Sequence, residues 1–265
     1  MSDMTSPSSS SSSTSSLPLL SLEGVHTHIG TYHILHGVDF SVPEGELSVL
    51  LGRNGAGKTT TLRTIMGLWP ASSGRVLFGG QQIGGPDARH LSTPAIARLG
   101  VAYVPENMGV FADLNVRDNM LLAARESRSA ADIDGERLEW IFGFFPALKK
   151  FWLQPAGTLS GGQKQMLAIA RAIVEPRRLI LVDEPCKGLA PAIIENMIQA
   201  FLELKQRRTT VLLVEQNFNF ARRLGDGVAV MDDGRIVHSG SMAALAEDEA
   251  LQGRLLGLSM STAAH

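Results

Sequence analysis

The sequence predicts an α/β fold built on a mostly parallel sheet, with a helical lobe inserted into it. Short apolar runs typical of buried strands alternate with stretches of helical periodicity along most of the chain. One long stretch, Val116 to Glu175, is mostly helical and separates two of these runs. Alternation of strands and helices favours parallel pairing, because a crossover helix is needed to return the chain for the next strand.

The expected elements follow one another from about Leu19. The expected strands are Leu47–Leu51, Val101–Val104, Leu179–Val182, Thr210–Val214, Val228–Met231 and Ile236–His238. Outside the lobe, the expected helices are Lys58–Leu68, Ala192–Lys205 and Ala243–Leu256. The sequence Asp232-Asp233-Gly234 between the last two strands is typical of a hairpin turn.

Composition excludes several classes of protein. Hydrophobic residues make up 44% of the 265 residues and charged residues 19%, which supplies a full core. The net charge of −2 provides no basic field for a nucleic-acid backbone, so we expect no nucleic-acid partner. The single cysteine, Cys186, fits a reducing compartment.

The expected location of the protein follows from two further observations. No apolar run is long enough to span a bilayer. The first lysine or arginine is Arg53, so the charged start of a signal peptide is missing, and we expect a cytoplasmic protein.

The two ends differ in composition from the rest of the chain. Residues 1–18 are mostly Ser, Thr and Pro, and such a segment cannot bury enough apolar area to offset its ordering entropy. We therefore expect a disordered tail at 1–18, a globular domain at 19–257 and a short tail at 258–265. The helical lobe is expected at about 107–175, inside the domain.

The stretch from Gly52 to Thr59 fits the pattern G-x-x-x-x-G-K-[ST], between a predicted strand and a predicted helix. Backbone N–H groups of such a loop wrap phosphates, and the helix N-terminus adds roughly half a positive charge. Lys58 would reach the β- and γ-phosphates, and the Thr59 hydroxyl would hold Mg²⁺. The candidate nucleotide-binding residues are Gly52, Arg53, Asn54, Gly55, Ala56, Gly57, Lys58, Thr59 and Thr60. This loop alone does not choose among kinases, GTPases and motor ATPases.

Two later segments distinguish among these classes of nucleotide-binding protein. Leu159-Ser160-Gly161-Gly162-Gln163 begins a helical stretch, and the strand Leu179–Val182 is followed by Asp183 and Glu184. A strand that ends in two acids places both at the carboxyl edge of the sheet, where ligands bind in open α/β folds. Asp183 can hold Mg²⁺ directly or through water, and Glu184 is the candidate general base for the attacking water.

Together with the phosphate loop, these segments resemble the ATPases of ABC transporters in order and spacing, from about Leu19 to Leu256. The resemblance implies a P-loop NTPase core with a mostly parallel sheet, a β-subdomain and an inserted helical lobe. It also implies that ATP with Mg²⁺ is hydrolysed between two chains, where the signature of one chain faces the γ-phosphate held by the other. The signature residues are Ser160, Gly161, Gly162 and Gln163.

Three variable positions narrow the resemblance. Glu106 stands where most of the family has the Q-loop glutamine, and Gln216 stands where most have the switch histidine. The D-loop segment, residues 188–191, lacks the usual aspartate. This combination is similar to one of the two ATPases of branched-chain amino-acid importers, and to relatives that import urea or short amides. The resemblance implies Glu106 as a further metal ligand, Gln216 as a catalytic residue and a different ATPase chain as the partner.

The resemblance also implies permease subunits, an indirect link to a substrate-binding protein, and a place on the inner face of the cell membrane. In the family, the region that contains Met108, Val110, Phe111 and Leu114 forms a groove for a short permease helix. The alternative is that these residues belong to the core of the helical lobe.

Two other functions are open to the family. A soluble ABC ATPase that is not coupled to transport is the alternative; such proteins usually carry long coiled coils or two ATPase units, and this chain has neither. A catalytically inactive regulatory module is disfavoured because Lys58, Asp183 and Glu184 are all present.

Three further features lie outside these motifs: the position expected to stack on adenine, the single cysteine and a group of histidines near the start. The aromatic residue that stacks on adenine in the family aligns with Ile29, so either Tyr32 stacks instead or the base packs on an aliphatic surface. Cys186 should lie near the dimer seam as a small, inert residue. The histidines near the start should be divided between the two faces of a strand and form no metal site; they are His26, His28, His33 and His36.

Overall fold

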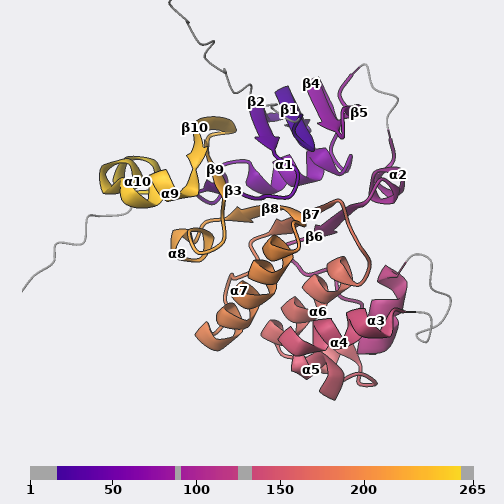
Figure 1. Ribbon diagram of the computed structural model, residues 1–265. Helices are drawn as coiled ribbons and strands as arrows, with labels where there is room; N and C mark the ends of the chain where they lie inside the picture. Colours follow the sequence, from indigo (N-terminus) through magenta and orange to yellow (C-terminus); the bar gives the residue numbers. More distant parts are fainter. Residues whose placement is uncertain (1–16, 87–90, 125–132, 258–265) are drawn as a thin grey trace, which may run out of the picture.

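The computed structural model describes residues 17–86, 91–124 and 133–257, which form two β-sheets and a set of helices (Figure 1). The predicted tail at 258–265 lies outside the described residues, as does nearly all of the tail predicted at 1–18.

The larger sheet has six strands in the order β10-β9-β3-β8-β7-β6. Every neighbouring pair is parallel except β9 and β10, which form the predicted hairpin with Asp232 paired to Arg235. The mostly parallel α/β sheet predicted from the sequence is therefore confirmed. Its strands are β3 (Leu47–Gly52), β6 (Val101–Val104), β7 (Leu179–Asp183), β8 (Thr210–Glu215), β9 (Gly227–Asp232) and β10 (Arg235–Ser241).

The smaller sheet is the antiparallel β-subdomain, in the order β2-β1-β4-β5. The sequence pattern did not locate its strands, because register shifts interrupt the alternation of apolar and polar residues, for example between Leu22 and Val25. Its strands are β1 (Leu20–Ile29), β2 (Tyr32–Val42), β4 (Ala71–Phe78) and β5 (Gln81–Gly84).

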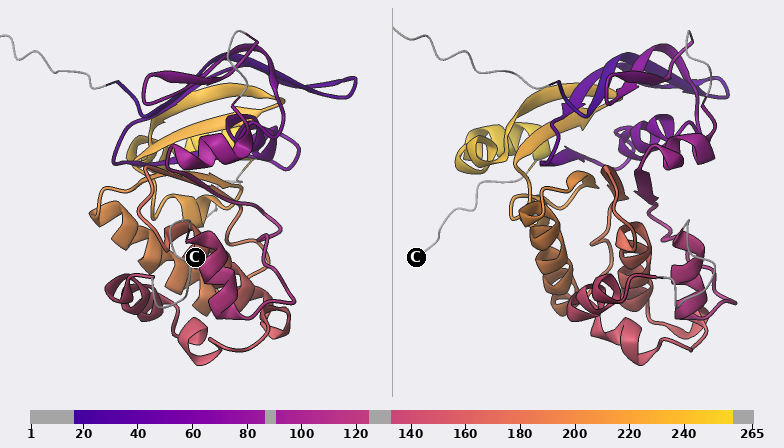
Figure 2. Two further views of the ribbon diagram at one scale, coloured as in Figure 1. Left: turned by 90° about the vertical axis from the view of Figure 1, so that its right-hand side faces the viewer. Right: turned by 45° about the vertical axis from the view of Figure 1, so that its right-hand side comes forward.

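Helix α1 (Lys58–Ile65) lies between the two sheets, and most other helices lie on the opposite side of the six-stranded sheet (Figures 1 and 2). The Thr27 and Thr64 hydroxyls, 3.1 Å apart, join β1 to α1. The remaining helices are α2 (Thr93–Arg98), α3 (Val116–Ala123), α4 (Gly135–Phe144), α5 (Pro146–Lys150), the 3₁₀ turn Ala156–Thr158, α6 (Gly161–Ile173), α7 (Pro191–Gln206), α8 (Phe218–Ala221), α9 (Met242–Glu247) and α10 (Glu249–Leu256).

Strand β3 supplies both hydrophobic cores, because successive side chains of a strand point to opposite faces. Val49 and Leu51 pack in the core shared with α6 and α7, whereas Leu50 packs in the core shared with α1 and the antiparallel sheet. All six residues of the strand are buried, as expected for a strand that is covered on both faces.

The predicted C-terminal helix, residues 243–256, is two helices. The Asp248 side chain accepts a hydrogen bond of 2.8 Å from the Leu251 backbone N–H and caps α10. The N–H groups in the first turn of a helix have no partner within the helix, and the Asp248 side chain accepts from one of them. A second helix therefore starts after Asp248.

The prediction that the four histidines divide between two faces is wrong, because β2 contains one extra residue. Thr27 pairs with Leu35 and His28 with His33, which leaves Ile34 as a bulge. The ring centroids of His33 consequently lie 4.1 Å from those of His28 and 4.0 Å from those of His36. The His33 ring stacks on those of His26 and His28 and is tilted against that of His36. No group of metal-ligating side chains with suitable geometry occurs among the described residues.

The buried side chain of Asn119 in α3 holds the segment that follows β6. Its amide donates to the Phe111 and Leu114 carbonyls at 2.9 and 3.3 Å, and its oxygen accepts from the Phe111 N–H at 3.0 Å. The Asn119 side chain therefore supplies the hydrogen bonds that backbone groups in a helix or strand would receive from other backbone groups.

We predict that Asn119→Ala lowers the free energy of unfolding by about 2 kcal/mol, because several backbone groups lose their partner at once. Urea denaturation measures this change. The exposed Gln199 of α7 gives a matched control, and Gln199→Ala should change stability by less than about 0.5 kcal/mol. Equal stability of the two variants would contradict the prediction.

Candidate functional site

The phosphate loop joins the carboxyl end of β3 to the start of α1. Gly57 has a φ of 105°, a left-handed conformation that L side chains rarely adopt. A Cβ on Gly52 would lie 2.5 Å from the Met231 carbonyl oxygen, so this position also needs glycine. The first turn of α1 has no side-chain cap, which leaves its N–H groups for a ligand.

Lys58 is buried and folds back over this loop. Its Nζ donates to the carbonyl oxygens of Gly52 and Arg53 at 2.9 and 3.0 Å. The same Nζ lies 3.1 Å from a carboxylate oxygen of Glu184, so the lysine is paired with the acid that directly follows β7. The sequence motif and the acidic pair, which are far apart in the chain, thus meet at one point.

Asp183 is the fully buried last residue of β7. It accepts hydrogen bonds from the Thr59 hydroxyl at 3.1 Å and from the Tyr103 hydroxyl at 3.5 Å. Burial raises its pKa to about 6; the Thr59 hydrogen bond opposes this, and the charges of Glu184 and Glu106 add to it. A hydroxyl and a buried acidic group at this distance are the oxygen ligands that Mg²⁺ prefers, so the donor set fits that ion.

Glu184 has a backbone conformation that few residues other than glycine adopt, with φ at 44°. Its N–H donates to the Val214 carbonyl at 2.9 Å, which fixes the residue at the end of β8. Such a conformation costs on the order of 1 kcal/mol and is typical of functional sites.

Lys187 is a site residue that the sequence analysis missed. Its Nζ lies 2.6 Å from Glu106 and 3.7 Å from Glu184, so it links two of the predicted acids. These carboxylates raise the pKa of Lys187, with the Glu106 hydrogen bond as the largest cause. Because Lys187 follows Glu184 by three residues in an irregular segment, no periodic signal indicated where it would lie.

These side chains surround a cavity of about 420 Å³ at the phosphate loop. It is lined by Ile34, Asn54, Gly55, Gly57, Lys58, Thr59, Thr60, Glu106, Glu184 and Lys187. An adjoining part of the site, a cavity of about 400 Å³, contains Gln216 beside Gly52, Arg53 and Asn54. The structure therefore brings the phosphate loop together with Glu106, Glu184 and Gln216.

The signature residues lie elsewhere, at the start of α6. Ser160 caps this helix: its hydroxyl accepts from the Gln163 N–H at 3.3 Å, and the Gln163 side chain accepts from the Ser160 N–H at 2.9 Å. Ser160 and Gly161 are exposed, and the two cavities at the phosphate loop are lined by other residues. Within one chain the signature thus stands apart from the phosphate loop.

The side chains considered for adenine differ in exposure. Tyr32 is 74% exposed at the start of β2, whereas Ile34 lines the cavity at the phosphate loop. An aliphatic wall is therefore already present at the cavity, and Tyr32 lies free at the surface.

The segment after β6 is partly core and partly surface. Met108 and Val110 pack against the core of the helical lobe, and Met108 also lines a cavity of about 410 Å³ with Arg171 and Ala168 of α6. Phe111 is 50% exposed, with the Arg171 guanidinium 5.0 Å from the centre of its ring. Leu114 is half-buried.

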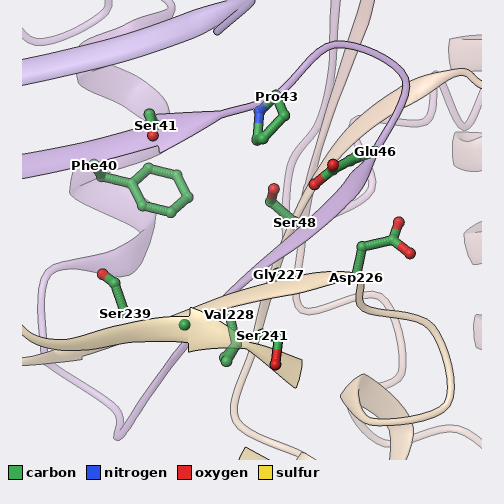
Figure 3. A pocket seen from close by; sticks show the side chains of 11 residues that line it. Phe40, Ser41, Pro43, Glu46, Ser48, Asp226, Gly227, Val228, Ser239 and Ser241 are labelled. Carbon is green, nitrogen blue, oxygen red and sulfur yellow. The ribbon is translucent and has the colours of Figure 1, made fainter. Parts of the chain in front are cut away.

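Another cavity, of about 450 Å³, lies at the opposite edge of the sheet, where β3 begins (Figure 3). Asp226 in its wall is already satisfied by the Leu47 N–H at 3.0 Å and the Lys205 Nζ at 2.7 Å. Its lining has neither the glycine loop nor the buried acids of the other edge, so the candidate site is at the phosphate loop.

Comparison with known proteins agrees with this geometry. Residues 35–187 match the model of the ABC transporter family. The high-affinity branched-chain amino acid transport ATP-binding protein BraG of Pseudomonas aeruginosa is 38% identical, over 90% of this chain and 100% of the relative. The probable branched-chain amino acid transport ATP-binding protein LivF of Archaeoglobus fulgidus is 34% identical, over 85% of this chain and 93% of the relative.

A solved structure shares the fold over nearly the whole chain. The crystal structure of the ADP conformation of MJ1267, an ATP-binding cassette of an ABC transporter, superposes with a TM-score of 0.74 at 25% identity. The alignment covers 92% of this chain and all of the other. None of the described helices is both long and apolar enough to cross a membrane. The chain belongs to the ATP-binding subunits of the ABC transporter family and is an ATPase that binds and hydrolyses ATP.

Proposed function

We propose that this chain powers uptake of branched-chain amino acids or related small amides through a separate permease. The observation that carries the ATPase part is the meeting of Lys58, Asp183 and Glu184 at the end of β3 and β7. The substrate class is supported by the functions named for BraG and LivF. We assign this function to one ABC ATPase domain at 19–257, with the lobe at about 107–175 inserted in it.

Phosphate binding falls to residues 52–60. When ATP enters, Lys58 exchanges the Glu184 carboxylate for the β- and γ-phosphates, since both positions lie within reach of one flexible side chain. The loop N–H groups and the start of α1 bind the remaining phosphate oxygens. Thr59, Asp183 and Glu106 would hold Mg²⁺, which neutralises phosphate charge when it is bound.

Release of Lys58 leaves the Glu184 carboxylate free to act as the general base for the attacking water. Gln216 lies at the same edge of the sheet and orients this water or the γ-phosphate by hydrogen bonds. A glutamine amide has no proton that titrates near neutral pH, so the proton transfer rests on Glu184.

The signature supports a two-chain site. ABC ATPases dimerise and pair with permease subunits, and we propose that Ser160, Gly161, Gly162 and Gln163 face the ATP of a second, different ATPase chain. The exposed start of α6 supports this arrangement, because Ser160 and Gly161 are accessible to a second chain and a helix N-terminus favours negative charge. The permease would receive substrate from a binding protein and hold this chain at the inner face of the cell membrane.

We propose that Phe111 and Met108 meet the permease. Phe111 is exposed beside a cavity between β6 and α6, a setting that suits a short amphipathic helix.

We predict that Lys58→Ala weakens ATP binding by about tenfold or more, roughly 1.4 kcal/mol, because it removes the buried ammonium group that lies directly against the loop carbonyls. Titration with ATP measures the affinity, and Lys149→Ala, at an exposed site in α5, serves as the control. Equal affinities of the Lys58 variant and the native chain would remove Lys58 from the site.

We predict that replacing Met108 and Phe111 by Ser abolishes copurification with the permease and leaves ATP binding intact. Leu122→Ser is the matched control, because this leucine is 59% exposed on α3. If the double variant fails to fold, these two residues belong to the core and not to a docking groove.

We predict that Glu184→Gln lowers the hydrolysis rate by about 10²-fold or more, since it removes the base and keeps the shape. ATP binding should persist. Gln216→Ala should cost only about tenfold, because it removes positioning alone. Single-turnover assays on the assembled ATPase pair separate this chain's site from that of its partner. Equal losses in the two variants would place Gln216 among the primary catalytic residues.

A further inference from the structure

Glu215 is the last residue of β8 and is only 2% exposed. Among the described residues no lysine, arginine or histidine forms an ion pair with it, and its carboxylate is held by neutral donors. A buried carboxylate without a cation is costly unless its oxygens are fully hydrogen-bonded. A buried carboxylate directly before Gln216 therefore needs a structural reason, and its hydrogen bonds supply one.

The two carboxylate oxygens bind two different loops. Oε1 accepts from the Cys186 backbone N–H at 3.3 Å and lies 2.9 Å from the Cys186 Sγ. Oε2 accepts from the backbone N–H groups of Gln216 and Asn217 at 3.1 and 3.2 Å. One side chain thus ties the segment after Glu184 to the segment that carries Gln216.

Both segments open into the same cavity of about 350 Å³. Glu184, Lys187 and Gln216 line it together with Cys186 and Glu215. Movement of one segment relative to the other would therefore change the distance between the proposed base and the glutamine that orients the water.

The thiol contributes as a donor in this arrangement. Burial raises the pKa of Cys186, and the adjacent Glu215 charge raises it further, so the sulfur keeps its proton. Burial also raises the pKa of Glu215, while the hydrogen bonds from the Cys186 thiol and from three backbone N–H groups lower it.

We propose that Glu215 is a positioning residue that locks the Cys186 and Gln216 segments into one unit, so that Glu184 and Gln216 keep a fixed separation during hydrolysis. The inference rests on the roles proposed above for Glu184 and Gln216. Glu215 itself does not touch the nucleotide; it acts through the backbone of its neighbours.

The first test is Glu215→Gln, which keeps the size of the side chain but places an amide NH₂ against backbone donors. In the assembled ATPase pair, single-turnover hydrolysis should fall about tenfold, the order expected for lost positioning. The KM for ATP should stay within about twofold, because the phosphate-binding residues are unchanged. If Glu215 had a purely structural role, Glu215→Gln would lower the unfolding temperature but would not lower kcat at a nearly constant KM.

The second test uses Cys186, where a conservative replacement exists. Cys186→Ala removes one donor to Glu215 and should lower single-turnover hydrolysis about threefold, since one of its four hydrogen bonds is lost while the three backbone donors remain. Cys186→Ser supplies a hydroxyl donor and should restore most of the rate. This pair does not depend on the folding of the Glu215 variant.

Asp226 provides the matched control, because its carboxylate also ties a strand end to a neighbouring segment, at the opposite edge of the same sheet. Asp226→Asn should lower stability and leave kcat unchanged. A native kcat in Glu215→Gln would overturn the inference, as would equal rates in the Ala and Ser variants of Cys186. Should Gln216→Ala also retain the native rate, the role proposed for Gln216 fails as well.

Discussion

The parallel pairing of β3 with β8 and of β8 with β7 determines where the chemistry can occur. Leu51 pairs with Glu215 and Asp183 pairs with Val214, so three strands end side by side. The phosphate loop, the two acids and Gln216 all follow these ends directly. Segments more than a hundred residues apart in the chain therefore meet without any long loop to bring them together.

Charge is the second constraint, because the strand ends gather three acids in a small volume. Burial is the largest cause that raises the pKa of Asp183 to about 6, and the charges of Glu184 and Glu106 add to it. Lys58 and Lys187 offset the other two carboxylates. Entry of a nucleotide must rearrange these pairs, since the phosphates compete with Glu184 for Lys58. We therefore infer that nucleotide binding and the release of Glu184, the proposed base, are coupled through Lys58.

The same edge also adjoins the segment that we propose as the permease contact. Glu106 follows β6 and is held by Lys187, while Met108 and Phe111 lie a few residues further toward the helical lobe. Asn119 fixes the backbone on the far side of Phe111. A short, hydrogen-bonded stretch of backbone therefore joins Glu106 to the segment proposed to meet the permease.

The sequence alone determined the α/β class, the phosphate loop and the acidic pair, because these depend on local patterns: a buried strand, a glycine-rich turn and acids at a strand end. It also proposed roles for Glu106, Gln216 and the signature, and the structure places Glu106 and Gln216 in cavities at the phosphate loop. Tertiary structure decided what local pattern does not encode. The bulge at Ile34 gathers the four histidines, Asp248 divides the last helix, and the irregular segment after β7 brings Lys187 to Glu106. The contact of Glu215 with Cys186 likewise joins two neighbouring strand ends, and only the pairing of β7 with β8 places them together.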